Sequence, residues 1–155
     1  MTTQNKTNWI HELKLSIPDL VTSACDAAVL IVLREHDGKL QVLLTQRSAN
    51  MRHHANEWSL PGGKTEENET NFETALRESD EEVGLKSDGL ENIGQLENFQ
   101  SKNGLDVSVC ISVLKSGTFD ECLNKDEVQK MIWFDVHHIC QKPDRTHRFE
   151  RNKDV

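Results

Sequence analysis

The residues most suited to chemistry are four acidic side chains packed into five consecutive positions of the segment "RESDEEVG", namely Glu78, Asp80, Glu81 and Glu82. At about 100° per residue, Glu78, Glu81 and Glu82 fall on one side of a helix. Like charges at these spacings destabilise a helix by roughly 0.2 to 0.5 kcal/mol per pair. Hard divalent cations such as Mg²⁺ bind oxygen ligands and turn this repulsion into shared coordination. The segment therefore indicates either a divalent-metal site or, as for most acidic runs, a solvated helix face.

The elements that position these acids can be read from periodicity and turn signals. A helix is predicted over residues 69–83 and ends at Gly84, where a left-handed residue is favoured. Strands are predicted over 24–35, 39–47, 93–100, 105–114 and 128–136, with turns at 36–38 and 103–104 and an aperiodic loop over 48–64. A helical N-terminal extension over residues 1–20 and a polar, partly disordered tail over 142–155 complete a single predicted α/β domain over residues 1–155.

Composition limits the classes of partner. The 155 residues carry a formal net charge of -8, which disfavours nucleic acid because phosphate backbones are held by clustered Lys and Arg. An anionic substrate would need a local counter-charge, such as a metal ion. No run of signal-peptide or membrane-spanning length is present, and the four scattered cysteines form no Cys-x-x-Cys pair. These features predict a cytoplasmic protein with reduced thiols and no membrane partner.

A longer frame surrounds the acidic segment. Gly63 is followed after five residues by Glu69, and after seven more by Arg77-Glu78-Ser79-Asp80-Glu81-Glu82-Val83-Gly84-Leu85. This resembles the Nudix box, Gly-x5-Glu-x7-Arg-Glu-U-x-Glu-Glu-x-Gly-U with U aliphatic, and departs from it only at Ser79. The resemblance implies an α/β/α sandwich with a mixed β-sheet. It also implies hydrolysis of a nucleoside diphosphate joined to another moiety.

The resemblance also implies roles for individual residues. Glu78, Glu81 and Glu82, with the Gly62 carbonyl, would hold Mg²⁺ or Mn²⁺. Arg77 and Glu69 would orient this group, while Gly63 and Gly84 would belong to its structural frame. Glu78 is the first candidate for the general base and Glu127 the second. Homodimers are common among Nudix proteins, so a homodimer is an expected assembly.

The segment before the box narrows the expected substrate. "LLTQRSANMRHHANEWSLPGGK" (43–64) is similar to the motif of the coenzyme A diphosphatase branch, with Asn56 and Leu60 standing where that motif has Gly and Phe. Arg47 and Arg52 would then bind substrate phosphates, since guanidinium groups suit phosphate oxygens. The expected reaction converts coenzyme A or acyl-CoA to 3′,5′-ADP and 4′-phosphopantetheine or its acyl derivative. Another Nudix substrate (a nucleoside triphosphate, ADP-ribose or a dinucleoside polyphosphate) and a non-catalytic nucleotide-binding module remain as alternatives.

Overall fold

The structure is a computed structural model that describes residues 3–17 and 23–141. The tail predicted over 142–155 lies outside the described residues, as do parts of the extension predicted over 1–20. The described elements, in chain order, are α1 (Thr3–Ser16), β1 (Ala27–His36), β2 (Lys39–Arg47), β3 (Trp58–Ser59), β4 (Gly62–Lys64), α2 (Asn71–Val83), the 3₁₀ turn η1 (Ser87–Gly89), β5 (Leu90–Gln95), β6 (Phe99–Gln100), β7 (Asp106–Leu114), β8 (Val128–Asp135) and α3 (Val136–Cys140).

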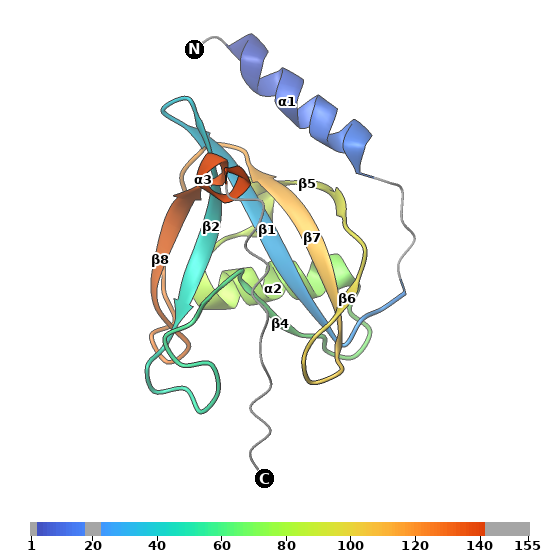
Figure 1. Cartoon of the computed structure of the whole chain (residues 1–155), viewed down its shortest axis with the longest axis vertical. Helices are drawn as coiled ribbons and strands as arrows, with labels where there is room; N and C mark the ends of the chain where they lie inside the picture. The colour runs from blue at the N-terminus through green and yellow to red at the C-terminus, as the bar shows by residue number, and fades with distance from the viewer. Residues whose placement is uncertain (1–2, 18–22, 142–155) are drawn as a thin grey trace.

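The strands form one mixed sheet with β1 near its centre (Figure 1). β1 pairs in parallel with β7 and antiparallel with both β2 and β4. β8 pairs antiparallel with β2, and β5 and β6 pair antiparallel with β7. The mixed sheet predicted for this chain is therefore confirmed.

Both predicted turns connect paired strands. Asp37 and Gly38 have positive φ values of 49° and 72°, the backbone that a tight two-residue hairpin requires, and His36 pairs with Lys39 across it. At the second turn Gly104 has a φ of 81°, and its N–H donates to the Ser101 carbonyl. The hairpin predicted at 36–38 and the turn predicted at 103–104 are both confirmed.

Several predicted boundaries were wrong. The loop predicted over 48–64 contains β3 and β4, which are two and three residues long and too short to show a period. The strand predicted over 93–100 is two strands, β5 and β6. The helix begins at Asn71 rather than at residue 69, because the Thr70 side chain caps it. η1 and the five-residue α3 were not predicted.

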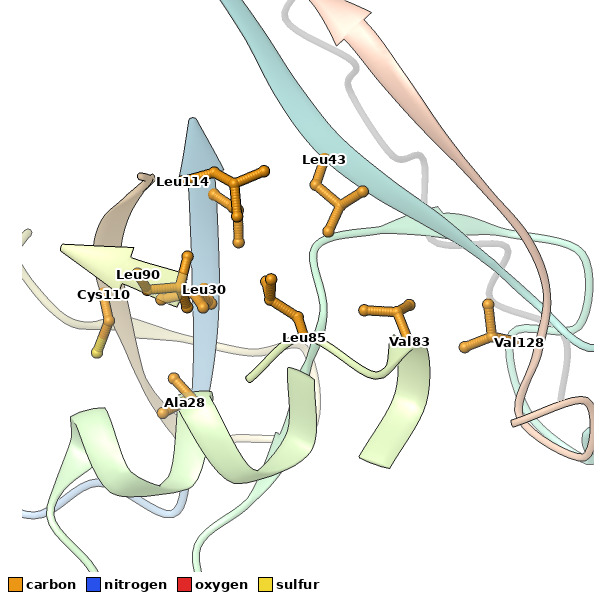
Figure 2. Close-up of a cluster of buried hydrophobic side chains, with 11 residues drawn as sticks. Ala28, Leu30, Leu43, Val83, Leu85, Leu90, Cys110, Leu114 and Val128 are labelled. Atoms are coloured by element: carbon orange, nitrogen blue, oxygen red, sulfur yellow. The ribbon is translucent and has the colours of Figure 1, made fainter. Parts of the chain in front are cut away.

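The sheet has a helix-covered core on each side. On one side α2 runs across the strands, and Figure 2 shows Leu30 of β1, Leu43 of β2 and Val83 of α2 among the clustered side chains. On the other side Leu33 and Val113 pack with partly buried side chains of α1, including Trp9. The α/β/α sandwich is confirmed. Among the described residues, no helix is long and apolar enough to cross a lipid bilayer.

Candidate metal and active site

Helix α2 is fixed at both ends by local hydrogen bonds. At its start the Thr70 hydroxyl accepts from the Glu73 N–H, and the Glu73 carboxylate accepts from the Thr70 N–H at 2.7 Å, a complete capping box. At its end Gly84 adopts a φ of 81° and donates its N–H to the Asp80 carbonyl. These bonds fix where α2 begins and ends, while its buried side chains, among them Ala75 and Val83, face the core and set the direction of each glutamate.

Ser79 shows what the inner face of α2 contacts. Its side chain is fully buried, as its place at an aliphatic position of the box predicts, and its hydroxyl donates to the Ala75 carbonyl at 2.7 Å. This satisfies the buried hydroxyl within the helix itself. The departure from the box therefore concerns packing and leaves the acidic side chains in place.

Three glutamates converge beside α2. Glu78 and Glu82 lie one turn apart on the helix, and Glu127 reaches them from the loop before β8. One carboxylate oxygen from each lies within 4.8 Å of the others. Glu82 is only 7% exposed, whereas Glu127 lies at the exposed rim. Hard oxygen donors grouped in this way suit a divalent cation such as Mg²⁺ or Mn²⁺.

Two glycines make room for this glutamate group. A Cβ on Gly63 would lie 2.4 Å from the Glu78 carboxyl carbon, and a Cβ on Gly62 would lie 2.4 Å from the Ala28 carbonyl oxygen. The Gly62 N–H donates to the Glu82 carboxylate at 3.3 Å. The side-chain-free backbone of β4 therefore lets the carboxylates sit directly against the sheet.

Burial makes the ionised form of the glutamate group unfavourable when no cation is bound. The pKa of Glu82 is raised to about 8, mainly by desolvation and in smaller part by the charges of Glu78 and Glu127. Desolvation also raises the pKa of Glu78, although Arg77 opposes this. Carboxylates held so close in a partly buried place are stabilised by an added positive charge. The donor set and its surroundings therefore fit a divalent ion.

Arg77 joins the glutamate group to the loop that precedes α2. Its guanidinium donates to both carboxylate oxygens of Glu69, at 2.6 and 3.1 Å, and to Glu78 at 3.0 Å. It also donates to the Lys64 carbonyl at 3.0 Å. This pairing lowers the pKa of Glu69 to about 2. Arg77 and Glu69 thus lie where orienting residues are needed.

Glu81 lies apart from the three converging glutamates. Its side chain is 55% exposed, and its carboxylate accepts from Arg77 at 3.3 Å. The fourth predicted metal ligand, the Gly62 carbonyl, belongs to a residue that contacts Glu82 through its N–H. The structure thus brings together Glu78, Glu82 and Glu127. The metal-binding role of Glu81 stays a prediction.

Glu127 is held in place by the end of α2. The backbone N–H of Asn124 donates to the Glu82 carbonyl at 2.9 Å, and the N–H of Cys122 donates to the Val83 carbonyl. The Asn124 carbonyl in turn accepts from the Glu127 N–H at 3.0 Å. The last carbonyls of a helix lack partners within it, so this loop both satisfies α2 and positions Glu127. The turn at Asn124 was not predicted from the sequence. The only local signal for it is the Asn-x-Asp spacing of residues 124–126.

The two predicted phosphate-binding arginines differ in placement. Arg47 ends β2 at a register shift in its pairing with β8, and it lies near enough to lower the pKa of Glu82. Its Nε is buried and has no hydrogen-bond partner among the described residues. Arg52 is exposed in the loop after β2 and forms no ion pair within the described part of the chain. Arg47 therefore adjoins the glutamate group, whereas Arg52 is available only to a ligand that reaches the loop.

This sandwich with its glutamate group defines the class of protein. The NUDIX domain model matches residues 26–153, and the chain belongs to that family. Among solved structures, an Ap4A hydrolase complex from C. elegans superposes with a TM-score of 0.63 at 24% identity, covering 74% of this chain and 83% of that one. This likeness shows the shared fold.

Two relatives are similar in sequence. "Nudix hydrolase 15, mitochondrial" from Arabidopsis thaliana is 43% identical over 109 residues, which cover 68% of this chain and 38% of the relative. "Peroxisomal coenzyme A diphosphatase ndx-8" from Caenorhabditis elegans is 36% identical over 126 residues, covering 73% of this chain and 53% of the relative. The chain thus spans about a third to two thirds of the length of the curated relatives it matches.

Proposed function

We propose that this Nudix domain is a divalent-metal-dependent diphosphatase whose substrate is coenzyme A or acyl-CoA. The observation that carries the proposal is the group of Glu78, Glu82 and Glu127, with carboxylate oxygens within 4.8 Å of one another. A purely structural helix gains nothing from burying two of these acids against a third. A protein that binds a diphosphate through divalent ions does gain, since the ions neutralise acids and phosphate together.

The chain's own residues account for binding and proton transfer. Divalent ions, when bound, would neutralise the diphosphate oxygens and lower the pKa of an attacking water. Glu78 or Glu127 would accept the proton of that water, and the exposed Glu127 can then release it to solvent. Arg77, held by Glu69, would keep the Glu78 carboxylate oriented. The guanidinium of Arg47, which lies near Glu82, would donate to a phosphate oxygen.

The two departures from the coenzyme A diphosphatase motif preserve its local structure. Asn56 replaces Gly and adopts a φ of 62°, a left-handed conformation in which Asn is the best tolerated side chain after Gly. Its side chain accepts from Gln129 at 2.9 Å, which ties the loop to β8. Leu60 replaces Phe and still packs against the apolar cluster on the α1 side of the sheet. The motif therefore supports coenzyme A as substrate despite both replacements.

One relative supports the same substrate. The nematode protein named a peroxisomal coenzyme A diphosphatase shares 36% identity over 126 residues. The shared region includes both the box and the segment before it. Together with the matching motif, this favours coenzyme A over the other diphosphates that the family cleaves.

The test is a substrate panel. The purified protein is incubated with Mg²⁺ or Mn²⁺ and coenzyme A, acyl-CoA, ADP-ribose, a dinucleoside polyphosphate or a nucleoside triphosphate, and products are identified by mass. We expect release of 3′,5′-ADP from coenzyme A or acyl-CoA at the highest kcat/KM. Arg47→Ala should raise KM about tenfold or more, since a charge-assisted hydrogen bond is worth roughly 1.5 to 3 kcal/mol.

Glu82→Gln and Glu81→Gln separate the possible sets of metal ligands. Both variants should fold, and Glu82→Gln should lose orders of magnitude in kcat. A comparable loss in Glu81→Gln would establish it as a ligand as well. Near-normal turnover in both would refute the metal-centred mechanism. Preference for another diphosphate would redirect the substrate assignment, and ligand affinity without turnover would mark a non-catalytic binding module.

A further inference from the structure

A cleft opens at the C-terminal end of α2, beside the glutamate group. Its volume is about 580 Å³, within the range of small-molecule sites. Apolar side chains form much of its lining: Leu85 is buried, while Phe119 and Leu123 are partly buried and pack against the main core. Three residues of this cleft already have a place in the account above: Glu81 is a predicted metal ligand, Gly84 ends α2, and the turn at Asn124 positions Glu127. The other lining residues have no role in the mechanism proposed above.

The cleft adjoins the candidate active site through shared elements. Glu81, which lines the cleft, directly precedes Glu82 and shares the Arg77 guanidinium with Glu78. Asn124 lines the cleft as well, and its backbone binds the Glu82 carbonyl and the Glu127 N–H. The cleft and the glutamate group therefore share the last turn of α2 and the 122–124 segment that is hydrogen-bonded to it.

The charges around the cleft restrict which part of a substrate fits there. Its lining includes four carboxylates, from Asp80, Glu81, Asp88 and Asp120, and a single ammonium group, from Lys86. Lys86 is already paired with Asp80 at 2.6 Å. The negative end of the α2 dipole also points this way. Phosphate groups are repelled by such surroundings, whereas an uncharged chain with an apolar end is accepted.

We propose that this cleft binds the uncharged arm of the substrate, the pantetheine chain with its thiol or acyl group, while the nucleotide half remains on the arginine side. This inference rests on the proposed function, because it needs a diphosphate that joins a nucleotide to an apolar arm. It assigns acyl-chain selection to the residues after β7, in particular Phe119 and Leu123. The motif before the box then has no part in choosing the acyl chain.

Two exposed cysteines provide a matched test. Cys122 lines this cleft, and Cys140 lines a separate cleft of about 480 Å³ near Asp135. Both are free and exposed, whereas Cys25 and Cys110 are buried. The rate of alkylation of each exposed thiol is measured by mass spectrometry under three conditions. The protein is alkylated alone, in the presence of S-octanoyl pantetheine, or in the presence of 3′,5′-ADP. Neither probe carries a free thiol, so neither consumes the reagent.

We expect S-octanoyl pantetheine to slow alkylation of Cys122 several-fold, with 3′,5′-ADP having no such effect and Cys140 unchanged throughout. Cys122→Phe, which narrows the cleft, should raise KM for octanoyl-CoA at least tenfold with kcat little changed. Cys140→Phe should behave like the parent protein. Thermal unfolding of both variants checks that they fold.

The two proposals fail in different ways. Unchanged Cys122 alkylation, or slowing by 3′,5′-ADP instead, overturns the cleft assignment even if octanoyl-CoA is cleaved. An unaltered KM for octanoyl-CoA in a folded Cys122→Phe variant also overturns the cleft assignment. If the parent protein cleaves neither coenzyme A nor acyl-CoA, the proposed function fails first.

Discussion

Replacing Glu82 by Gln should stabilise the metal-free protein while strongly reducing the stabilisation that a divalent metal gives it. Glu82 is 7% exposed, and burial is the main cause that raises its pKa from 4.5 to about 8. A carboxyl whose pKa is higher in the folded state stabilises the protein fully below its unfolded pKa. That stability is lost as the pH rises through the folded pKa. Metal-free protein should therefore lose stability between about pH 4.5 and pH 8.

The size of this effect follows from the pKa difference. At roughly 1.4 kcal/mol per pKa unit, the change from 4.5 to about 8 sets an upper bound of about 5 kcal/mol. Part of the raised pKa of Glu82 comes from the neighbouring charges rather than from burial, and local relaxation lowers the cost further. We therefore expect Glu82→Gln to gain about 2 kcal/mol at pH 8, which corresponds to roughly 4 to 8 °C in Tm.

The assay is thermal unfolding of the parent and Glu82→Gln in EDTA and in Mn²⁺, from pH 5 to pH 8.5. In EDTA the variant should have the higher Tm at pH 8, and the two Tm values should converge toward pH 5. Manganese should raise the Tm of the parent, because a ligand that binds only the folded state stabilises it. Manganese should raise the Tm of the Glu82→Gln variant much less than it raises the Tm of the parent.

Glu81→Gln is the matched control, since it makes the same change on the same helix at a side chain that is 55% exposed. Its Tm in EDTA should stay within about 2 °C of the parent, as expected for a surface substitution. The reasoning is refuted if Glu82→Gln is less stable than the parent at pH 8 in EDTA. The reasoning is refuted equally if Glu81→Gln gains as much thermal stability in EDTA as Glu82→Gln does.

Two further substitutions test how the glutamates are positioned. Gly63→Ala should lower kcat at least a hundredfold, because the added Cβ would lie 2.4 Å from the Glu78 carboxyl carbon. Gly89→Ala is the control, since a Cβ there meets nothing within 4 Å and kcat should not change. Equal kcat values for the two variants in steady-state assays would contradict this. Asn124→Ala removes a side-chain acceptor of the turn before Glu127 and should lower kcat about tenfold with little change in KM. Asn124→Asp keeps the acceptor and should recover most of the rate; a change confined to KM would argue against a positioning role.

The sequence predicted those parts of the fold that have long periods or complete motifs. The α2 stripe, the hairpin at 36–38 and the turn at 103–104 follow from the spacing of apolar residues and from glycines that need positive φ, whereas the mixed sheet followed from the resemblance to the Nudix family. The Thr70–Glu73 capping box was present in the sequence and would have placed the start of α2 two residues later. β3 and β4 could not be predicted, because they form only when longer strands offer them edges.

The site was predicted less completely than the fold. Helical spacing alone treats Glu78, Glu81 and Glu82 as equivalent, and the structure separates them by burial. The difference arises from β4, whose glycines lie against Glu78 and Glu82 and leave Glu81 outward. Glu127 is far from the box in sequence and reaches the group only because its loop satisfies the end of α2. No local pattern encodes such a contact.

The guanidinium of Arg77 has a consequence for how this domain could acquire new specificities. It locks Glu69, Glu78 and the Lys64 carbonyl into one rigid unit before any ligand arrives. The loops over 48–57 and 115–123 lie outside that unit and contribute none of the three converging carboxylates of the glutamate group. Exchange of residues 49–56 with those of a relative should therefore leave the three carboxylates in place, whereas a grafted 115–123 segment must keep the hydrogen bond from the residue 122 N–H to the Val83 carbonyl. The 49–56 loop is thus the part of this domain best suited to loop grafting.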